Sequence, residues 1–380
     1  MKTIRLLIVF GLLSVAAWIV GCDRRPAVQP SGRSVKIGVI APFSGADSTK
    51  GREGLRGIRA AQRLTPYLRN GDAVRLVTED DGNRAVRSLQ ALKKLVCRDR
   101  VSAVMTFSSS DPVLEMAGVA DEYRTPILAL VATHPDVTRR SRFVSQLPFD
   151  DDFQGAVAAL YVRDELLIDR AAVFVDPDSA YSTNLGRTFA GKFESIGGVI
   201  TATTPLAHDR QDFERLLRDV HAGGPELLYL PVHAVEVIRI IRTAHRVGWR
   251  PRMMGSDGLL STVLTQHRKD VYLLDGLLAT DLYSSGDPLT AYGKKVQSLY
   301  RGEPTSYAVL GVEGYALLVD AMNRCGGRPG RLCINRALRS THDFTGVLGK
   351  IAIGPDGKAG RPLYINAIHN GHMRYVVKVY

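Results

Sequence analysis

The sequence predicts an α/β protein built from two similar lobes, each a parallel β-sheet covered by helices, with a cleft between them. Short apolar runs alternate with amphipathic stretches of helical length, which is typical of a parallel sheet covered on both faces. This alternation restarts near residue 150, and the segments after residue 347 return to strands that can cross back between lobes. A chain of 380 residues also suits two domains better than one.

The composition excludes several classes of protein. Hydrophobic residues make up 45% and charged residues 23%, as in ordinary globular proteins. Four cysteines are too few for a fold held mainly by disulfides. The formal net charge is +12, but the basic residues form only short clusters among acidic ones, and aromatic residues are only 7%. We therefore expect no nucleic-acid partner.

The N-terminus is a targeting segment. Met1–Arg5 is basic, and Leu6–Trp18 is apolar but shorter than the ~20 residues that a membrane-spanning helix needs. Small residues then precede Cys22, and this pattern resembles a bacterial lipoprotein signal. The resemblance implies that residues 1–21 are removed and that Cys22 carries acyl chains, which anchor the protein to a membrane. An ordinary signal peptide, or a membrane helix in which Cys22 is incidental, is the alternative.

Residues 22–34 are polar, contain two prolines and lack periodicity, as expected of a tether. Asp23 follows the cysteine directly, which in enteric bacteria resembles the signal that retains a lipoprotein in the inner membrane. We therefore expect the mature protein on the periplasmic side of the inner membrane, where conditions are oxidising.

Export changes the interpretation of the remaining cysteines. Cys325 and Cys333 bracket a loop rich in Gly and Pro, and we predict a disulfide between them. Cys97 sits in the apolar face of a predicted helix and is predicted to be a buried thiol. No Cys-x-x-Cys pair is present, and His369 and His372 flank Asn-Gly in an apparent hairpin turn. We expect neither a metal site nor a cofactor.

In the first half, short apolar runs predict buried parallel strands, and the stretches between them predict helices. We expect strands at residues 35–42, 73–80, 102–107 and 126–132, with helices at 51–64, 84–97 and 111–123.

The second half repeats the pattern and then adds two helices and three late strands. We expect helices at 151–166, 182–197, 211–224, 235–249, 288–300 and 307–323, and strands at 171–178, 198–206, 226–232, 253–258, 276–283, 347–354, 362–369 and 372–380.

Six segments, taken together in their order and spacing, resemble a known family. They are Val35–Gly45 (VKIGVIAPFSG), Val101–Thr138, Asp176–Gly186 (DPDSAYSTNLG), Asp209–Pro231, Met253–Leu259 (MMGSDGL) and Phe344–Gly357 (FTGVLGKIAIGPDG). From about Val35 to its C-terminus the chain is similar to type I periplasmic binding proteins of the leucine/isoleucine/valine-binding family, with the acetamide receptors as cousins.

The resemblance implies two Rossmann-like lobes joined by three crossovers, with hinges near Asp150, Tyr283 and Phe344. The expected first lobe is 35–150 plus 283–343, and the second is 151–282 plus 344–380. It also implies a lipid-anchored protein that captures an amino acid or a similar small molecule in the cleft and delivers it to an ABC permease. The alternative is a sensor of the same fold that binds an amide or small carboxylate and signals to a membrane receptor.

Family resemblance also places ligand contacts in the first lobe. It implies that Ser108 donates to the ligand carboxylate, while the Ala132 backbone and the Thr133 hydroxyl contact both ends of a zwitterion. From the residues alone, the serines at 108–110 and Asp111 could equally cap the helix that follows them. Thr133 could likewise serve only in a local turn.

In the second lobe, Tyr181 matches the aromatic residue that closes over the ligand, and Asp257 matches the acidic partner of its ammonium group. Asp257 could also cap the following helix. Two departures put a branched-chain aliphatic ligand in doubt. Lys50 stands where many relatives have an aromatic residue, and His233 or Ala234 stands where some have a tyrosine. Lys50 faces either an anionic ligand side chain or solvent.

Enzymatic activity is not expected. The sequence has no G-x-S-x-G elbow, H-E-x-x-H helix or P-loop. Gly51, Gly54 and Gly57 imitate a dinucleotide-binding pattern but lie inside a predicted helix. Ser108 and His134 have no evident third member of a catalytic triad.

Overall fold

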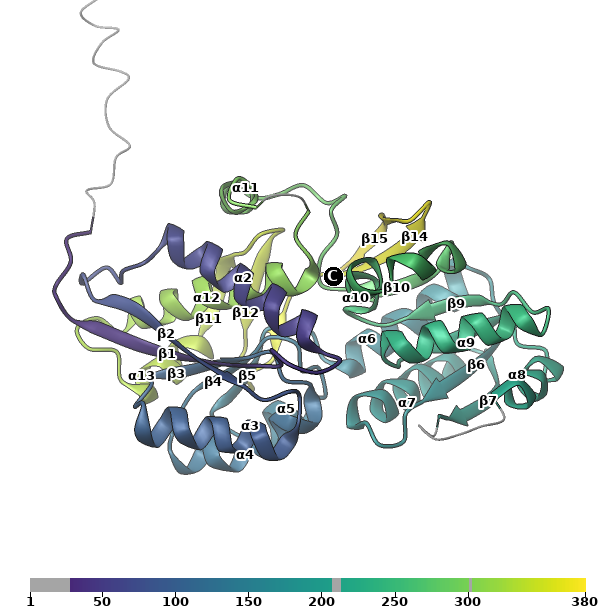
Figure 1. Cartoon of the computed structure of the whole chain (residues 1–380), viewed down its shortest axis with the longest axis horizontal. Helices are drawn as coiled ribbons and strands as arrows, with labels where there is room; N and C mark the ends of the chain where they lie inside the picture. The colour runs from purple at the N-terminus through teal and green to yellow at the C-terminus, as the bar shows by residue number, and fades with distance from the viewer. Residues whose placement is uncertain (1–27, 207–212, 301–302) are drawn as a thin grey trace, which may run out of the picture.

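The computed structural model describes residues 28–206, 213–300 and 303–380. The predicted signal peptide, Cys22 and most of the tether lie outside these residues. Two lobes lie side by side, each built around its own sheet (Figure 1). This confirms the α/β fold class predicted from the sequence. Within the described part of the chain, no helix combines the length and apolar composition needed to cross a membrane.

The first lobe is a five-stranded parallel sheet in the order β2-β1-β3-β4-β5. Its strands are β1 Ser34–Ala41, β2 Ala73–Asp80, β3 Ala103–Thr106, β4 Ile127–Ala129 and β5 Val144–Gln146. Its helices are α2 Ser48–Leu64, α3 Ala85–Lys93, α4 Ser110–Glu122, α5 Asp136–Arg139 and α12 Ser306–Arg324.

Helices cover both faces of this sheet, with α3 and α4 on one side and α2 and α12 on the other (Figure 1). Alternate β1 residues serve the two faces, so Val39 and Ile40 belong to different apolar clusters. One prediction here was wrong. The end of α3 widens into a π-helical turn, η1 Lys94–Arg98, which turns Leu95 inward and leaves Cys97 exposed.

The second lobe contains a seven-stranded sheet in the order β15-β14-β10-β9-β8-β6-β7, with β6 to β10 parallel and β14 and β15 antiparallel. The strands are β6 Arg170–Val175, β7 Val199–Pro205, β8 Leu227–Leu230, β9 Arg252–Gly255, β10 Leu278–Asp281, β14 Leu363–His369 and β15 His372–Val379. His369 and His372 flank the hairpin turn between β14 and β15, as predicted.

Helices α6 and α7 pack on one face of this sheet, and α8, α9 and α10 pack on the other. The bounds are α6 Asp151–Leu160 with a π-helical turn η2 Tyr161–Glu165, α7 Ala180–Ser195, α8 Phe213–Ala222, α9 Ala234–Arg246, α10 Leu259–Gln266 and a 3-10 helix η3 Arg268–Leu274.

A small third sheet and two further helices lie with the first lobe. They are β11 Thr341–Thr345, β12 Lys350–Ile353, β13 Ala359–Gly360, α11 Ala291–Gln297 and α13 Arg331–Leu338. Cys325 and Cys333, on either side of the loop before α13, form a disulfide with their Cα atoms 5.9 Å apart.

The third crossover differs from the expected position near Phe344. The backbone N–H of Gln146, in the first lobe, donates to Gly357 O at 2.8 Å, and Arg339 donates to Val144 O at 2.7 Å. The bond to Gly357, together with the bond from the Val347 N–H to Glu313 Oε1 of α12 at 2.8 Å, holds residues 344–360 against the first lobe. The chain therefore passes to the second sheet only after Gly360, immediately before β14.

Candidate functional site: the cleft between the lobes

A cavity of about 670 Å³ lies between the two lobes. Its walls come from loops that follow strands β1, β2 and β3 in the first lobe and β6, β8 and β9 in the second. The carboxyl ends of parallel strands therefore face the cavity, which is where ligands bind in open α/β sheets. The polar lining residues include Asp47, Lys50, Asn83, Ser109 and Ser110 from the first lobe and Tyr181, His233, Ser256 and Asp257 from the second.

The second-lobe wall is organised around Asp257. Its Oδ1 accepts hydrogen bonds from the Tyr181 hydroxyl at 3.1 Å and from Gln154 Nε2 at 3.0 Å. Tyr181 also donates to the Ser256 hydroxyl. Burial raises the pKa of Asp257 to about 6, although the bond from Tyr181 and the charge of Lys50 act in the opposite direction. A half-buried carboxylate whose charge is only partly compensated suits a cationic ligand group.

The first-lobe wall is organised around Lys50, which is buried in the first turn of α2. Its ammonium donates to the Ser109 hydroxyl at 2.9 Å and lies 3.5 Å from Asp47 Oδ1. Asn83 Nδ2 donates to Asp47 at 2.7 Å and to Ser109 at 3.0 Å. The nearby Lys50 charge lowers the pKa of Asp47, so the Asp47 carboxylate is held in its charged form.

His233 enters the cleft from the second lobe, at the N-terminus of α9. Part of its surface is exposed, yet its confinement within the cleft and the positive charge of Lys50 both lower its pKa. His233 and Lys50 therefore lie within electrostatic reach of each other across the cleft.

Three predicted ligand contacts lie behind the cavity wall. Ser108 is fully buried and donates to Asp81 Oδ2, with the Thr106 hydroxyl 2.6 Å away. The Ala132 carbonyl accepts a bond from Gln146 at 3.0 Å. Thr133 is also fully buried, and its hydroxyl has no hydrogen-bond partner among the described residues. The structure thus brings Lys50, Tyr181, His233 and Asp257 to the cavity but not Ser108, Ala132 and Thr133.

Other cavity residues were not predicted as ligand contacts. Ser109 and Ser110 directly follow Ser108, the serine that the resemblance assigns to the ligand carboxylate, and Ser256 directly precedes Asp257. Their position next to the predicted contacts Ser108 and Asp257 is the sequence signal that could have identified them. Asn83 and Gln154 gave no local signal, because their partners come from other loops.

The lobes touch each other beside the cleft. The Ala180 N–H donates to Asp111 Oδ1 at 3.2 Å, and the Tyr307 hydroxyl donates to Gly258 O at 3.1 Å. These bonds join the first lobe to the loops after β6 and β9, so the second-lobe wall lies close to the first.

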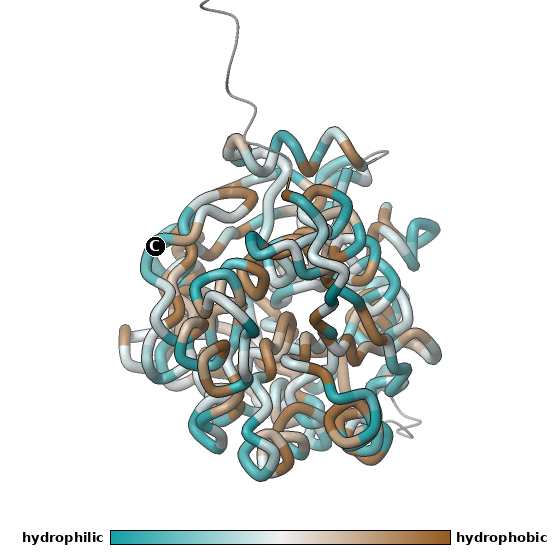
Figure 2. Tube along the Cα trace, turned by 90° about the vertical axis from the view of Figure 1, so that its left-hand side faces the viewer, coloured by the Kyte–Doolittle hydropathy of each residue, from teal (hydrophilic) through white to brown (hydrophobic). Residues whose placement is uncertain are grey.

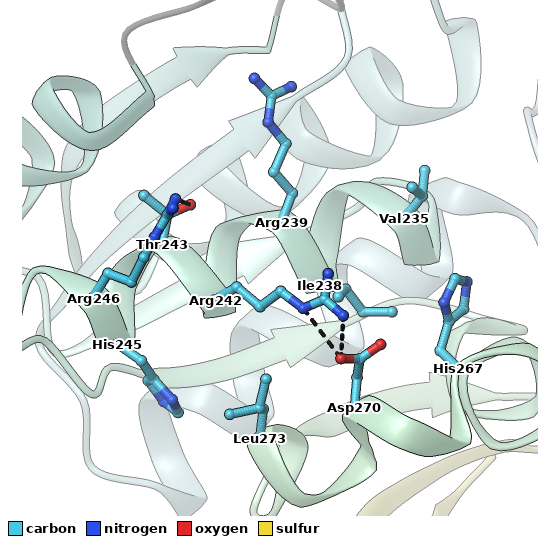
Figure 3. Close-up of a pocket in the computed structure, with 10 residues that line it drawn as sticks. All are labelled: Val235, Ile238, Arg239, Arg242, Thr243, His245, Arg246, His267, Asp270 and Leu273. Atoms are coloured by element: carbon cyan, nitrogen blue, oxygen red, sulfur yellow. Dashed lines mark hydrogen bonds and ion pairs between the residues drawn. The ribbon is translucent and has the colours of Figure 1, made fainter.

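A second cavity of about 560 Å³ lies on the outer side of α9 and shares Val235 and His267 with the cleft (Figure 3). Arg242 donates through Nε and Nη2 to Asp270. Arg246 lies 3.6 Å from Glu214, and Arg239 lies 3.7 Å from Glu236. Each arginine already has a carboxylate partner, so this surface offers no uncompensated cationic site.

The tube view in Figure 2 shows hydrophobic residues gathered mostly inside the body and hydrophilic residues over its exterior. The polar residues of the interlobe cavity differ from this general pattern, because several of them are shielded from bulk solvent. Lys50 and Ser256, for example, are buried although both line the cavity.

Comparisons with known proteins agree with this geometry. Residues 34–372 match a family model described as "Periplasmic binding protein". The chain is 26% identical over 298 residues to an "Amino acid binding protein" of Pseudomonas aeruginosa, covering 77% of this chain and 79% of that protein. It is 23% identical over 337 residues to "Leu/Ile/Val-binding protein homolog 2" of Brucella abortus, covering 87% and 89%.

Solved structures share the fold. The leucine binding protein LivK of Thermotoga maritima aligns with a TM-score of 0.83 and 28% identity, over 91% of this chain and 98% of that one. A solute binding protein of Rhodopseudomonas palustris BisB5 in complex with 3,4-dihydroxybenzoic acid aligns with a TM-score of 0.80 and 18% identity, over 91% and 97%. The two-lobed fold therefore serves ligands of different chemistry in those proteins.

Proposed function

Because this chain belongs to the periplasmic binding protein family, in its type I branched-chain amino acid group, we propose that it captures an amino acid or a close analogue and delivers it to an ABC permease. The family consists of solute-binding proteins, so the activity is binding and release rather than a chemical reaction.

One observation carries this proposal: a half-buried carboxylate on one wall faces hydroxyl and helix-terminal donors on the other. Asp257 offers its charge to a ligand ammonium group. Ser109 and Ser110 stand at the N-terminus of α4, where hydroxyls and backbone N–H groups favour a carboxylate. A zwitterion would satisfy both walls together.

The division of these groups between lobes explains how binding would drive closure. A ligand that meets the first-lobe wall gains the contacts of Asp257 and Tyr181 only when the second lobe approaches. This gives the closed state a higher affinity, which is the only way a ligand can shift such an equilibrium. Ser108, Ala132 and Thr133 support the wall from behind in this proposal, and they do not make the first ligand contact.

We also propose that Cys22 carries a lipid anchor. The described chain begins beside the first lobe, where the Ser31 hydroxyl and Arg33 Nε donate to Asp72 at 2.6 and 2.9 Å. These two bonds fix the start of the folded body to the first lobe, so a tether would join the body there.

A thermal-shift panel of amino acids and small carboxylates, followed by calorimetry, tests the proposal. A ligand that binds the folded state raises the melting temperature, and the stabilisation grows with the logarithm of its concentration relative to its Kd. The best ligand should bind Asp257→Asn at least about tenfold more weakly, because a desolvated ammonium group loses its counter-charge. Glu115→Gln, an exposed change on α4, is the control. Equal affinity of both variants for an amino-acid ligand would contradict the ammonium assignment.

A further inference from the structure

We infer that the ligand carries a second carboxylate in its side chain, received by Lys50 together with His233. This inference rests on the proposed function and narrows it to acidic amino acids. Among the described residues that line the cavity, Lys50 is the one lysine or arginine. It is also buried, so a cation has been placed inside the site and not on its rim.

The hydrogen bonds of Lys50 leave capacity for a ligand. Its ammonium has three N–H donors. Ser109 accepts one at 2.9 Å, whereas the Asp47 oxygen lies 3.5 Å away, beyond the usual length of an N–H···O bond. The structure records no other acceptor for this ammonium among the described residues. A buried cation with an incomplete set of acceptors is stabilised by an anionic ligand group.

Asp47 does not remove this capacity, because its own position is fixed elsewhere. Its Oδ2 accepts from Asn83 Nδ2 at 2.7 Å, and Asn83 in turn binds both the hydroxyl and the N–H of Ser109. The network Asp47–Asn83–Ser109 therefore holds Lys50 in place at the cavity wall and leaves its ammonium available there.

Five aspartates line the cavity, and their arrangement decides against a cationic ligand side chain. Asp257 has the ammonium role, and Asp47 is matched with Lys50. Asp111 accepts the Ala180 N–H at 3.2 Å, and Asp176 accepts the Asp178 N–H at 3.0 Å. Asp178 itself is exposed. A cationic side chain next to Lys50 would meet like charge, which costs binding free energy.

His233 completes the receiving group from the opposite lobe. It has no side-chain hydrogen bond among the described residues, and it lies within electrostatic reach of Lys50. A ligand carboxylate between the two would accept a hydrogen bond from each side. Because one partner belongs to each lobe, this second carboxylate would add to the preference for the closed state.

Calorimetry with matched ligand pairs tests the inference. L-glutamate and L-aspartate are compared with L-glutamine and L-asparagine, and L-leucine and L-lysine serve as the aliphatic and cationic references. We expect the better acidic ligand to bind the wild-type protein at least about tenfold more tightly than its amide, since charge-assisted hydrogen bonds exceed neutral ones. Lys50→Gln should remove most of this difference, and Lys50→Arg should keep part of it.

Lys295→Gln, an exposed lysine on α11, is the charge-matched control and should leave both affinities unchanged. If Lys50→Gln fails to fold, the wild-type preference for acid over amide still decides. Tighter binding of leucine, an amide or lysine would overturn the inference while supporting amino-acid capture. Binding of none of the six amino acids would overturn this inference, and a thermal-shift panel that also yields no amino acid or close analogue as ligand would overturn the proposed function as well.

Discussion

Tyr181 and Asp257 lie 76 residues apart in the sequence, yet a hydrogen bond of 3.1 Å joins the Tyr181 hydroxyl to Asp257 Oδ1. Gln154 donates to the same oxygen, which leaves Asp257 Oδ2 without a hydrogen-bond partner among the described residues. The phenol and the amide thus orient the carboxylate, and its second oxygen remains for a ligand in the cavity that Asp257 lines.

Tyr181→Phe should weaken ligand binding by roughly three- to tenfold, about the net free energy of one ordinary hydrogen bond. The ring is retained, so the cavity keeps its shape. Calorimetry measures the effect, with Tyr272→Phe as control because that tyrosine is 75% exposed on η3. An affinity equal to that of the control would show that Tyr181 does not orient Asp257.

Ligand affinity should fall as the pH is lowered through about 6. The pKa of Asp257 in the empty protein is raised to about 6 by burial, so below that value the group is mostly neutral and attracts an ammonium group weakly. Binding at pH 5.5 should therefore release a proton. Calorimetry in buffers of different ionisation enthalpy would detect it, and Asp257→Asn should abolish the release. A pH-independent affinity between 5 and 7 would contradict this role.

Asp281, at the end of β10, should lower stability as the pH rises. Burial raises the pKa of Asp281 from its ordinary value of 3.8 to about 7. At a pH between these two values, Asp281 is protonated in the folded state and ionised in the unfolded state. Stability therefore falls across this window and stays reduced above it. Its Oδ1 accepts the Leu282 N–H at 2.7 Å, a bond that an asparagine can keep.

Asp281→Asn should consequently gain on the order of 2–4 kcal/mol over the wild-type protein between pH 4.5 and pH 8, by the free-energy value of each pKa unit. Thermal or denaturant unfolding across that range measures it. Asp219→Asn, an exposed change on α8, supplies the reference profile. Parallel stability profiles for the wild-type protein and Asp281→Asn would refute the assignment.

Replacing both Cys325 and Cys333 by serine should lower the free energy of unfolding by roughly 2–3 kcal/mol, from the entropy of the short loop that the bond closes. Ligand affinity should not change, since neither residue lines the cleft. Urea unfolding with and without reductant measures the cost, and Cys97→Ser is the matched single-thiol control. A wild-type protein that is insensitive to reductant would argue against the bond.

Cys22→Ser should leave the protein either uncleaved or free of the membrane after cell fractionation. Without the thiol, no thioether to a lipid can form, so the proposed anchor is lost. Cys97→Ser should fractionate as the wild-type protein does. Mature-size Cys22→Ser protein that remains in the membrane fraction would contradict lipidation at this position.

Much of the fold was predictable because its signals are local. The predicted strand at residues 73–80 has the observed bounds of β2, and the late hairpin follows from its Asn-Gly turn. The short elements α5, β5 and β13 were not predicted, since two to four residues are too few to show a period. The crossover after Gly360 depends on distant bonds to Gln146 and Val144, which no local pattern encodes.

The site likewise has residues that the sequence identifies and residues whose positions depend on distant contacts. Lys50, Tyr181, His233 and Asp257 were placed at the cavity by family resemblance. Which serine of the run faces the ligand depends on a residue outside it. Asp81, 27 positions earlier in the chain, binds the Ser108 hydroxyl, so Ser109 and Ser110 line the cavity instead.

Helices α2 and α12 meet backbone to backbone. A β-carbon at Gly57 would overlap the Ala308 carbonyl, and one at Gly311 would overlap that of Gly54, which explains the glycines that imitated a nucleotide-binding pattern. Contact this close prevents the two helices from sliding past each other, so they form a single rigid unit. Lys50 stands at one end of it. The other end, about 25 Å away by the rise of a helix, is held where the Tyr315 hydroxyl donates to Thr65 O. A ligand group that contacts Lys50 therefore rests on a helix pair that continues as one unit to the far edge of the first lobe.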